Sequence, residues 1–214
     1  MKYQPINSAL FIKNRKDFAS QMKPNSLAIF NSNDIYPTSA DGTMPFEQHR
    51  DIFYLSGVDQ EESVLLLFPD CPNHELREVL FVRETNDHIV IWEGEKLSKE
   101  TAFAISGIKP VFWLQELEKV LFEMASYCDT FYINTNEHYR AKIETETRED
   151  RFTKSLLAKY PSHSVAKSNP ILQRLRSVKD AIELDLMQRA CDITEKGFRR
   201  LLHFVKPDVW EYEV

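Results

Sequence analysis

One periodic stretch near the carboxyl end constrains the fold more than any other feature of the sequence. Between residues 175 and 204, apolar or small residues recur every three or four positions, with a mean spacing of about 3.6, the period of an α-helix. These residues are Leu175, Val178, Ile182, Leu186, Ala190, Ile193, Gly197, Leu201 and Phe204. One continuous helix over this stretch would be about 45 Å long. A rod of that length needs a partner surface that the remaining chain can hardly supply, so we expect the sequence to be part of a longer protein.

The composition limits the possible partners. The chain has 214 residues, of which 43% are hydrophobic and 28% are charged, as in soluble globular proteins. Its net charge is −6 and its basic residues are dispersed, so we expect no nucleic-acid partner. The three cysteines are far apart and odd in number, which indicates free thiols in a reducing compartment. Because no apolar run has the length of a membrane span or a signal peptide, we expect a cytoplasmic protein with no membrane partner.

Short apolar runs alternate with amphipathic stretches over the first 170 residues. The expected strands are residues 27–30, 64–68, 79–82, 89–92 and 131–133. A polar turn separates the third strand from the fourth, which predicts a hairpin. The expected helices are residues 8–22, 98–106 and 113–124, and Ser98 and Gly107 are placed to cap the second of them. Since several strands are apolar on both faces, the pattern favours a layered α/β domain.

Motifs for common catalytic and cofactor sites are missing from the sequence. The five glycines form neither a dinucleotide-binding motif nor a P-loop, and no serine lies in a nucleophile elbow. The six histidines occur singly and no Cys-x-x-Cys is present, so no metal site is expected. Acidic pairs are frequent, but many lie in polar segments such as residues 140–154, which we expect to face solvent as a helix or loop. We therefore expect no catalytic and no metal-binding residue in this chain.

A dense polar cluster, residues 47–51, stands directly before an aromatic run in PFEQHRDIFYLSGVDQEESVLLLFPD, residues 45–70. This segment resembles a characteristic sequence of the N-terminal domain of the creatinase/prolidase/aminopeptidase P family. The resemblance continues, in order, through EVLFV, IVIWEGEKLS, RLRSVKDAIELDLMQRACDITEKGF and KPDVWEYEV. Asp208 stands where the family usually has glycine, a departure that puts this last turn in question. The matching segments cover nearly the whole chain, and Xaa-Pro aminopeptidases are the most similar members.

The resemblance implies a fold and an activity. Residues 1–173 would form a three-layer, ribonuclease-H-like α/β domain with a mixed sheet. Residues 174–214 would contain the first helix of a truncated "pita-bread" catalytic domain. In the family, two divalent metals, commonly manganese, are held downstream by two Asp, one His and two Glu. The full-length protein would remove the residue that precedes proline at the N-terminus of a peptide. This fragment would bind no metal and would be inactive by itself, although it would shape substrate access and assembly in a homo-oligomer.

Two residues are implied to lie near a substrate site of a neighbouring subunit. Trp92 matches a family tryptophan that reaches towards that site, and its indole suits stacking beside a proline ring. The alternative for Trp92 is an edge-strand aromatic packed within its own domain. Asp51 matches a family aspartate near the same surface. For Asp51 we favour a structural role, in which a carboxylate before an aromatic strand fixes a turn and Arg50 is a candidate partner. The polar cluster is then mainly scaffold.

Two other functions remain open from the sequence. The chain could be a non-catalytic peptide-binding or assembly module of the same fold, because no catalytic residue is recognised in it. Alternatively, the full-length protein could be a hydrolase of the prolidase or creatinase type, with a different substrate.

Overall fold

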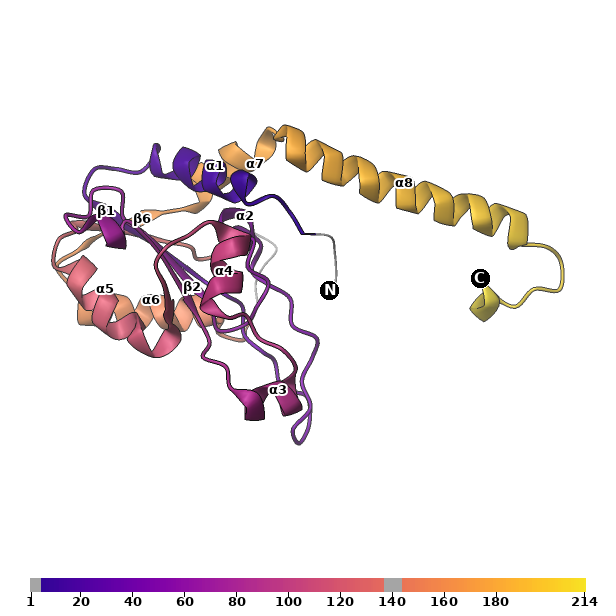
Figure 1. The fold of residues 1–214 in the computed structure, drawn as a ribbon, viewed down its shortest axis with the longest axis horizontal. Coiled ribbons are helices and arrows are strands. Elements are labelled where there is room, and N and C mark those ends of the chain that lie inside the picture. The colour runs from indigo at the N-terminus through magenta and orange to yellow at the C-terminus, as the bar shows by residue number, and fades with distance from the viewer. Residues whose placement is uncertain (1–4, 137–143) are drawn as a thin grey trace. The chain divides into compact units, whose positions relative to one another are not determined.

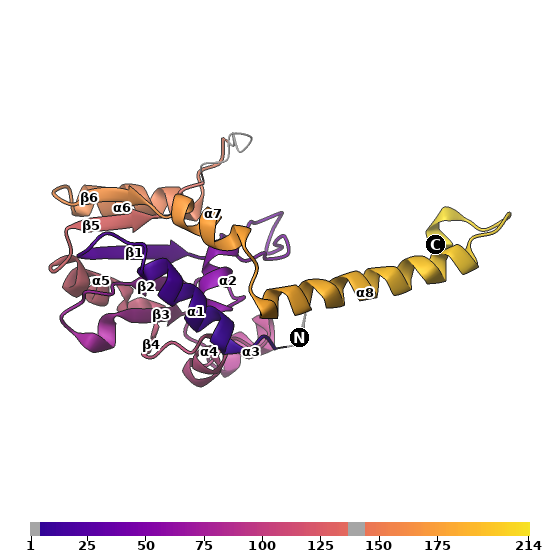
Figure 2. The ribbon, with the colours of Figure 1, turned by 90° about the horizontal axis from the view of Figure 1, so that it is seen from above.

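A six-stranded mixed sheet forms the centre of the structure (Figures 1 and 2). The computed structural model describes residues 5–136 and 144–214. The strands are β1 (Ser26–Asn31), β2 (Val64–Leu67), β3 (Glu78–Val82), β4 (Val111–Trp113), β5 (Thr130–Ile133) and β6 (Ser164–Lys167). Their order across the sheet is β4-β3-β2-β1-β5-β6. Strand β2 is antiparallel to both of its neighbours, and the outer pairs β3–β4, β1–β5 and β5–β6 are parallel.

Helices cover both faces of this sheet. The helices of the described chain are α1 (Ser8–Ala19), α2 (Arg50–Ser56), α3 (Asp87–Glu93), α4 (Lys99–Ser106), α5 (Leu117–Ala125), α6 (Arg148–Lys159), α7 (Asn169–Ser177) and α8 (Ala181–Phe204). Short 3₁₀ turns are η1 (His74–Leu76), η2 (Leu114–Glu116) and η3 (Glu211–Glu213). Figure 1 shows α5 and α6 on one side of the strands and α1 and α7 on the other.

The core divides into two apolar clusters, one on each face of the sheet. All residues of β1 and β2 are buried, as expected for strands covered on both faces. Ile29 of β1 packs in one cluster with Met124 of α5, whereas Phe30 packs in the other with Phe18 of α1. The rings of Phe18 and Phe30 meet edge to face at 5.3 Å. The three-layer α/β architecture with a mixed sheet is thereby confirmed.

Two helices end in the same serine-glycine turn. Ser56 and Gly57 end α2, and Ser106 and Gly107 end α4. Each serine hydroxyl donates a 2.7 Å hydrogen bond to the carbonyl four residues earlier and accepts one from the N–H two residues later. Both glycines adopt left-handed φ values, 71° and 69°, a conformation that costs glycine little. Ser98 and Gly107 thus cap α4 as predicted from the sequence.

Arg15 of α1 joins these two turns. Its side chain is buried, and Nη1 donates to the carbonyl oxygens of Leu55 and Ser106, each at 2.9 Å. Its Nε donates to Glu78 Oε2 at 2.8 Å. A cation at the carboxyl ends of two helices satisfies their terminal carbonyls and complements their dipoles. Arg15 therefore fixes α1, α2 and α4 against one another on one face of the sheet.

Several sequence predictions of local structure are wrong. Residues 89–92 lie in helix α3 rather than in a strand, so the predicted hairpin does not form. The aromatic run 53–55, which the structural interpretation of Asp51 treats as a strand, lies in helix α2. Strand β6 was not predicted, and the helix expected at 113–124 begins only at Leu117, after strand β4. A run of three or four apolar residues fits a buried strand and a short helix equally well, which explains the first two errors.

The continuous helix predicted for residues 175–204 is also wrong. It is interrupted between α7 and α8, where Asp180 caps α8 by accepting a 2.9 Å hydrogen bond from Ile182 N. Glu183 completes the capping box by accepting from Asp180 N at 2.8 Å. The sequence carried this signal, an Asp followed three residues later by Glu, inside the periodic stretch. Asp208, beyond α8, has a φ of 70°, the left-handed conformation that favours glycine.

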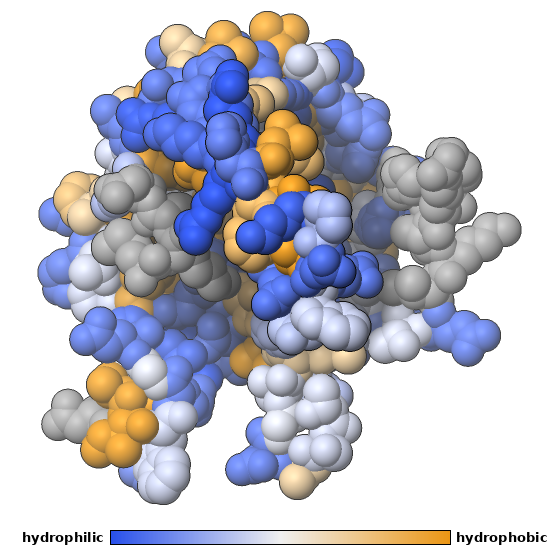
Figure 3. Space-filling model, turned by 90° about the vertical axis from the view of Figure 1, so that its right-hand side faces the viewer, coloured by the Kyte–Doolittle hydropathy of each residue, from blue (hydrophilic) through white to orange (hydrophobic). Residues whose placement is uncertain are grey.

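The described chain forms two compact units, Met1–Arg176 and Ser177–Val214. Within the second unit, α8 has no buried residue, and apolar side chains such as Ile193, Phe198 and Leu202 are exposed. Figure 3 shows one face of the molecule, on which hydrophobic patches lie among hydrophilic residues. Among the described residues, no helix is both long enough and apolar enough to cross a membrane. The division into functional domains at residues 173 and 174 stays a prediction.

Candidate functional site

Trp92 lies near the end of α3 with its indole in solvent. The side chain of Asn86 caps the start of this helix by accepting from Ile89 N at 3.0 Å, and Gly94 ends it with a φ of 80°. Trp92 is 77% exposed and the adjacent Ile91 is 75% exposed. The alternative expectation, an edge-strand aromatic packed in its own domain, does not hold. A large apolar ring held in water is available to a partner surface.

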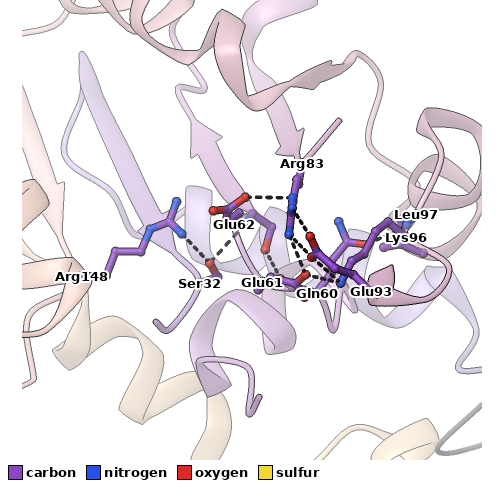
Figure 4. A network of polar contacts seen from close by, with 10 residues as sticks. Ser32, Gln60, Glu61, Glu62, Arg83, Glu93, Lys96, Leu97 and Arg148 are labelled. Carbon is purple, nitrogen blue, oxygen red and sulfur yellow. Dashed lines mark hydrogen bonds and ion pairs between the residues drawn. The ribbon is translucent and has the colours of Figure 1, made fainter. Parts of the chain in front are cut away.

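A charged network anchors the carboxyl end of α3 (Figure 4). Arg83, which follows β3, donates to both carboxylate oxygens of Glu93, at 2.6 and 2.8 Å. This bidentate bond lowers the pKa of Glu93 below its ordinary value. Lys96 in turn binds Glu61 Oε1 at 2.5 Å, and Glu61 is buried. The helix that carries Trp92 is thus tied to the turn before β2.

The polar cluster at residues 47–51 serves mainly to hold neighbouring loops. Gln48 Nε2 donates to the carbonyl oxygens of Val58 and Gln60, at 3.1 and 2.9 Å. Gln48 Oε1 accepts from the backbone N–H of His49 at 2.8 Å. Gln60 extends the connection, because its side-chain oxygen accepts from Leu97 N at 2.6 Å. These contacts link the loop before α2 to the loop after α3.

Asp51, the second predicted site residue, lies in the first turn of α2 and has a side-chain exposure of only 13%. Its Oδ1 forms a 2.6 Å ion pair with Arg176 of α7, and its Oδ2 accepts from Asn134 Nδ2 at 3.1 Å. Arg50, the partner suggested by the sequence, is exposed and does not fill this role among the described contacts. Adjacent residues on a helix do not face each other, which explains the wrong choice.

His49 adjoins this ion pair and caps α2. Its Nδ1 accepts from the backbone N–H of Asp51 at 3.3 Å and lies 3.8 Å from the carboxylate of Asp51. Burial lowers the pKa of His49, an effect that the Asp51 carboxylate opposes and the Arg176 guanidinium reinforces. A neutral imidazole also keeps Nδ1 able to accept the capping hydrogen bond.

A buried carboxylate that sequence patterns did not indicate lies at the carboxyl ends of β1 and β5. Glu149 of α6 accepts from Asn31 Nδ2 at 2.9 Å and from Asn134 N at 3.4 Å. Burial raises the pKa of Glu149. The expectation that residues 140–154 face solvent is therefore wrong at Glu149, while residues 140–143 lie outside the described part of the chain. Asn134 connects Glu149 to Asp51, so one polar network joins four elements of the domain.

The prediction of no metal site is considered for the residues that the structure describes, 5–136 and 144–214. No three His, Cys, Asp or Glu side chains there lie together so that they could hold an ion. The contacts of Asp51 and Glu149 are to amide nitrogens, a guanidinium and an imidazole. These two carboxylates therefore organise the fold around the loops, and whether this chain binds metal stays a prediction.

The sequence of this chain matches the model of one known family and several known proteins. The sequence model of that family, described as the aminopeptidase P N-terminal domain, matches residues 11–132. The Xaa-Pro aminopeptidase of Escherichia coli (strain K12) is 24% identical over 210 residues, covering 98% of this chain and 47% of that protein. The chain thus spans about half the length of the curated relatives that it matches.

Solved structures give the same picture. A Bacillus anthracis protein assigned as an aminopeptidase P has a TM-score of 0.87 at 26% identity, covering 97% of this chain and 49% of that one. A zinc-substituted E. coli aminopeptidase P, solved in complex with product, has a TM-score of 0.81 at 24% identity, covering 98% and 48%. The second likeness shows a common fold. In both comparisons the similarity extends over nearly the whole described chain.

Proposed function

The chain belongs to the family of the aminopeptidase P N-terminal domain, and on this premise we propose that it is the amino-terminal part of a metal-dependent Xaa-Pro aminopeptidase. Such an enzyme removes the first residue of a peptide whose second residue is proline. The observation that carries the proposal is the family match over residues 11–132. The likeness to the Bacillus anthracis protein, at 26% identity, supports it.

The proposal places catalysis outside the described residues. Those residues do not fit a metal site, because no three candidate ligands gather among them. The E. coli relative, by contrast, has been solved in a zinc-substituted form. We therefore assign a pair of divalent ions, manganese or another metal, to the half of the full-length protein that this chain does not match. This chain alone would be inactive.

Trp92 is proposed to contact substrate bound in a neighbouring subunit of a homo-oligomer. Its support is an indole that is 77% exposed on a helix whose end is fixed by the Arg83–Glu93 ion pair. An exposed aromatic that is held in place loses little conformational entropy when it packs against a proline ring. Shaping access to the active site is thus the proposed contribution of α3.

Asp51 is proposed to act within its own domain rather than on substrate. Its carboxylate already binds Arg176 at 2.6 Å and Asn134 at 3.1 Å, and His49 lies beside it. A substrate would have to displace a partly buried ion pair, which is costly. Arg176 is the last residue of the first compact unit, so Asp51 would fix the start of the connection to α8.

Helix α8 is proposed to begin the catalytic part of the full-length protein. Its exposed apolar side chains, such as Ile193 and Leu202, would then be covered by chain that lies beyond this sequence. We also propose a cytoplasmic location, because the three cysteines are free thiols, as is usual in a reducing compartment.

The test is hydrolysis by the protein expressed from its complete gene. We expect it to release the first residue from a tripeptide with proline in second position, and not from the alanine counterpart. Activity should be lost on chelation and restored by Mn²⁺. Xaa-Pro dipeptides and creatine separate the prolidase and creatinase alternatives. A natural protein that ends near Val214 and binds peptides without cleaving them would instead establish the non-catalytic module.

A further inference from the structure

A cavity of about 400 Å³ opens at one edge of the sheet, in the size range of small-ligand sites. Strands β3 and β4 are parallel and both end at this edge. Arg83 and Glu84 follow β3, and Leu114 and Gln115 follow β4, and all four line the cavity. The space outside the carboxyl ends of parallel strands is where α/β sheets commonly bind ligands.

The cavity wall offers hydrogen-bond acceptors. Glu62, just before β2, and Glu84 contribute carboxylates to the lining. Gln115 Nε2 donates to Glu84 Oε2 at 3.1 Å, so a donor of this amide is already used. Such a wall suits a ligand that carries N–H donors and positive charge.

The positive charge at the cavity is already neutralised. Arg83 directs its guanidinium to Glu93 in a bidentate bond, and its Nε lies 3.4 Å from Glu62 (Figure 4). An anionic ligand would have to compete with these carboxylates. Ile89 of α3 and Leu114 add apolar surface to the cavity lining. This surface could cover the methylene stem of a long side chain.

We propose that this cavity binds the lysine side chain of a peptide. The ammonium lies against the carboxylate of Glu84 and shares the carboxylate of Glu62 with Arg83, and the four-carbon stem packs on Ile89 and Leu114. Lysine suits this arrangement because its charge is compact and its stem is flexible and apolar. That the lysine belongs to a peptide rests on the proposed function, whereas the binding of an alkylammonium does not.

The test is a titration of the 214-residue chain, without metal, followed through its backbone amide resonances. Three probes are compared: N-acetyl-lysine-N-methylamide, its norleucine analogue, which has the same stem without the ammonium, and pentylamine. We expect saturable shifts at residues 84–89 and 114–115 with the lysine probe, in the millimolar range. The norleucine probe should cause none. Glu84→Gln should weaken binding about fivefold, as the loss of one exposed ion pair would. Glu75→Gln, at an exposed site beside the other end of β3, should leave it unchanged.

Each outcome decides the matter. No saturable shift with the lysine probe, equal shifts with norleucine, or equal binding in folded Glu84→Gln would overturn the proposal. If Glu84→Gln does not fold, the comparison of lysine with norleucine on the native chain decides alone. Pentylamine binding as tightly as the lysine probe would retain the ammonium site and overturn the peptide as its source. Since no hydrolysis is measured, failure here is separate from failure of the proposed peptidase.

Discussion

Arg15 is expected to stabilise the fold, because its guanidinium donates hydrogen bonds to two buried carbonyl oxygens and to one carboxylate. Arg15→Met should lower the free energy of unfolding by about 2–4 kcal/mol, because two helix-terminal carbonyls lose their donor in a buried place. Urea denaturation measures this loss. The control is Lys13→Met on the same helix, where an exposed ion pair with Asp17 is removed and a change below about 0.5 kcal/mol is expected. Equal effects of the two substitutions would contradict the role of Arg15.

His49 should make stability depend on pH below neutrality. Its pKa is lowered in the folded protein, so the unfolded chain takes up a proton first as the pH falls. Stability is complete above the unfolded value of about 6.5 and declines below it, until the folded-state pKa is reached. His49→Asn keeps a capping acceptor and should remove this part of the decline. Urea denaturation at several pH values between about 8 and 5 tests this. An unchanged slope in His49→Asn, or an equal change in exposed His74→Asn, would refute it.

The important side-chain pairs could not be read from the sequence. Asp51 and Arg176 are separated by 125 positions, and Asn31 and Glu149 by 118. The tertiary fold brings these distant residues together, so the spacing of neighbouring residues in the sequence cannot predict such pairs. Hence Arg50 was the natural but wrong partner for Asp51. Trp92 could be named from a family resemblance, but its exposure depended on α3 being a helix.

At the scale of elements, the sequence predicts the buried strands well and the edge of the sheet poorly. Strands β1, β2, β3 and β5 are apolar runs bounded by polar or proline-containing turns, and their existence was expected. Strand β6, with the sequence Ser-Val-Ala-Lys, lies at the edge and is largely exposed, so it carries no apolar run. A polar edge strand discourages pairing with other chains, which also hides it from pattern reading.

The turn that ends α2 gives a prediction for one element. A Cβ at Gly57 would lie 2.3 Å from the ring of Phe11, at a φ of 71°. Gly57→Ala should therefore cost about 2–4 kcal/mol, from backbone strain and overpacking together. Gly107→Ala is the matched control, since Gly107 has nearly the same left-handed backbone, with a φ of 69°, but its Cβ would meet only the flexible end of the half-exposed Ile12 side chain. It should cost only about 1 kcal/mol. Equal losses in urea denaturation would mean that the contact with Phe11 contributes nothing.

At the scale of the whole molecule, Trp92 is expected to act on function without acting on stability. Trp92→Ala in the full-length protein should lower kcat/KM for a tripeptide with proline in second position. Because the indole is 77% exposed, the free energy of unfolding should change by less than about 0.5 kcal/mol. Phe122→Ala, which removes an aromatic ring 64% exposed on α5, is the control and should leave the kinetics unchanged. Unaltered kinetics in Trp92→Ala would contradict the proposed contact.

The first compact unit should fold without the second. Residues 1–176 should keep the melting temperature of the longer chain within a few degrees, because α8 has no buried residue. They should also bind less of a dye specific for apolar surface, since the exposed side chains of α8 are gone. Residues 1–168 are the control: they lack Ile171 and Leu172, both buried, and should lose several kcal/mol of stability. If residues 1–176 melted as early as this control, α8 would have to support the domain, and its proposed assignment to the catalytic part would fail.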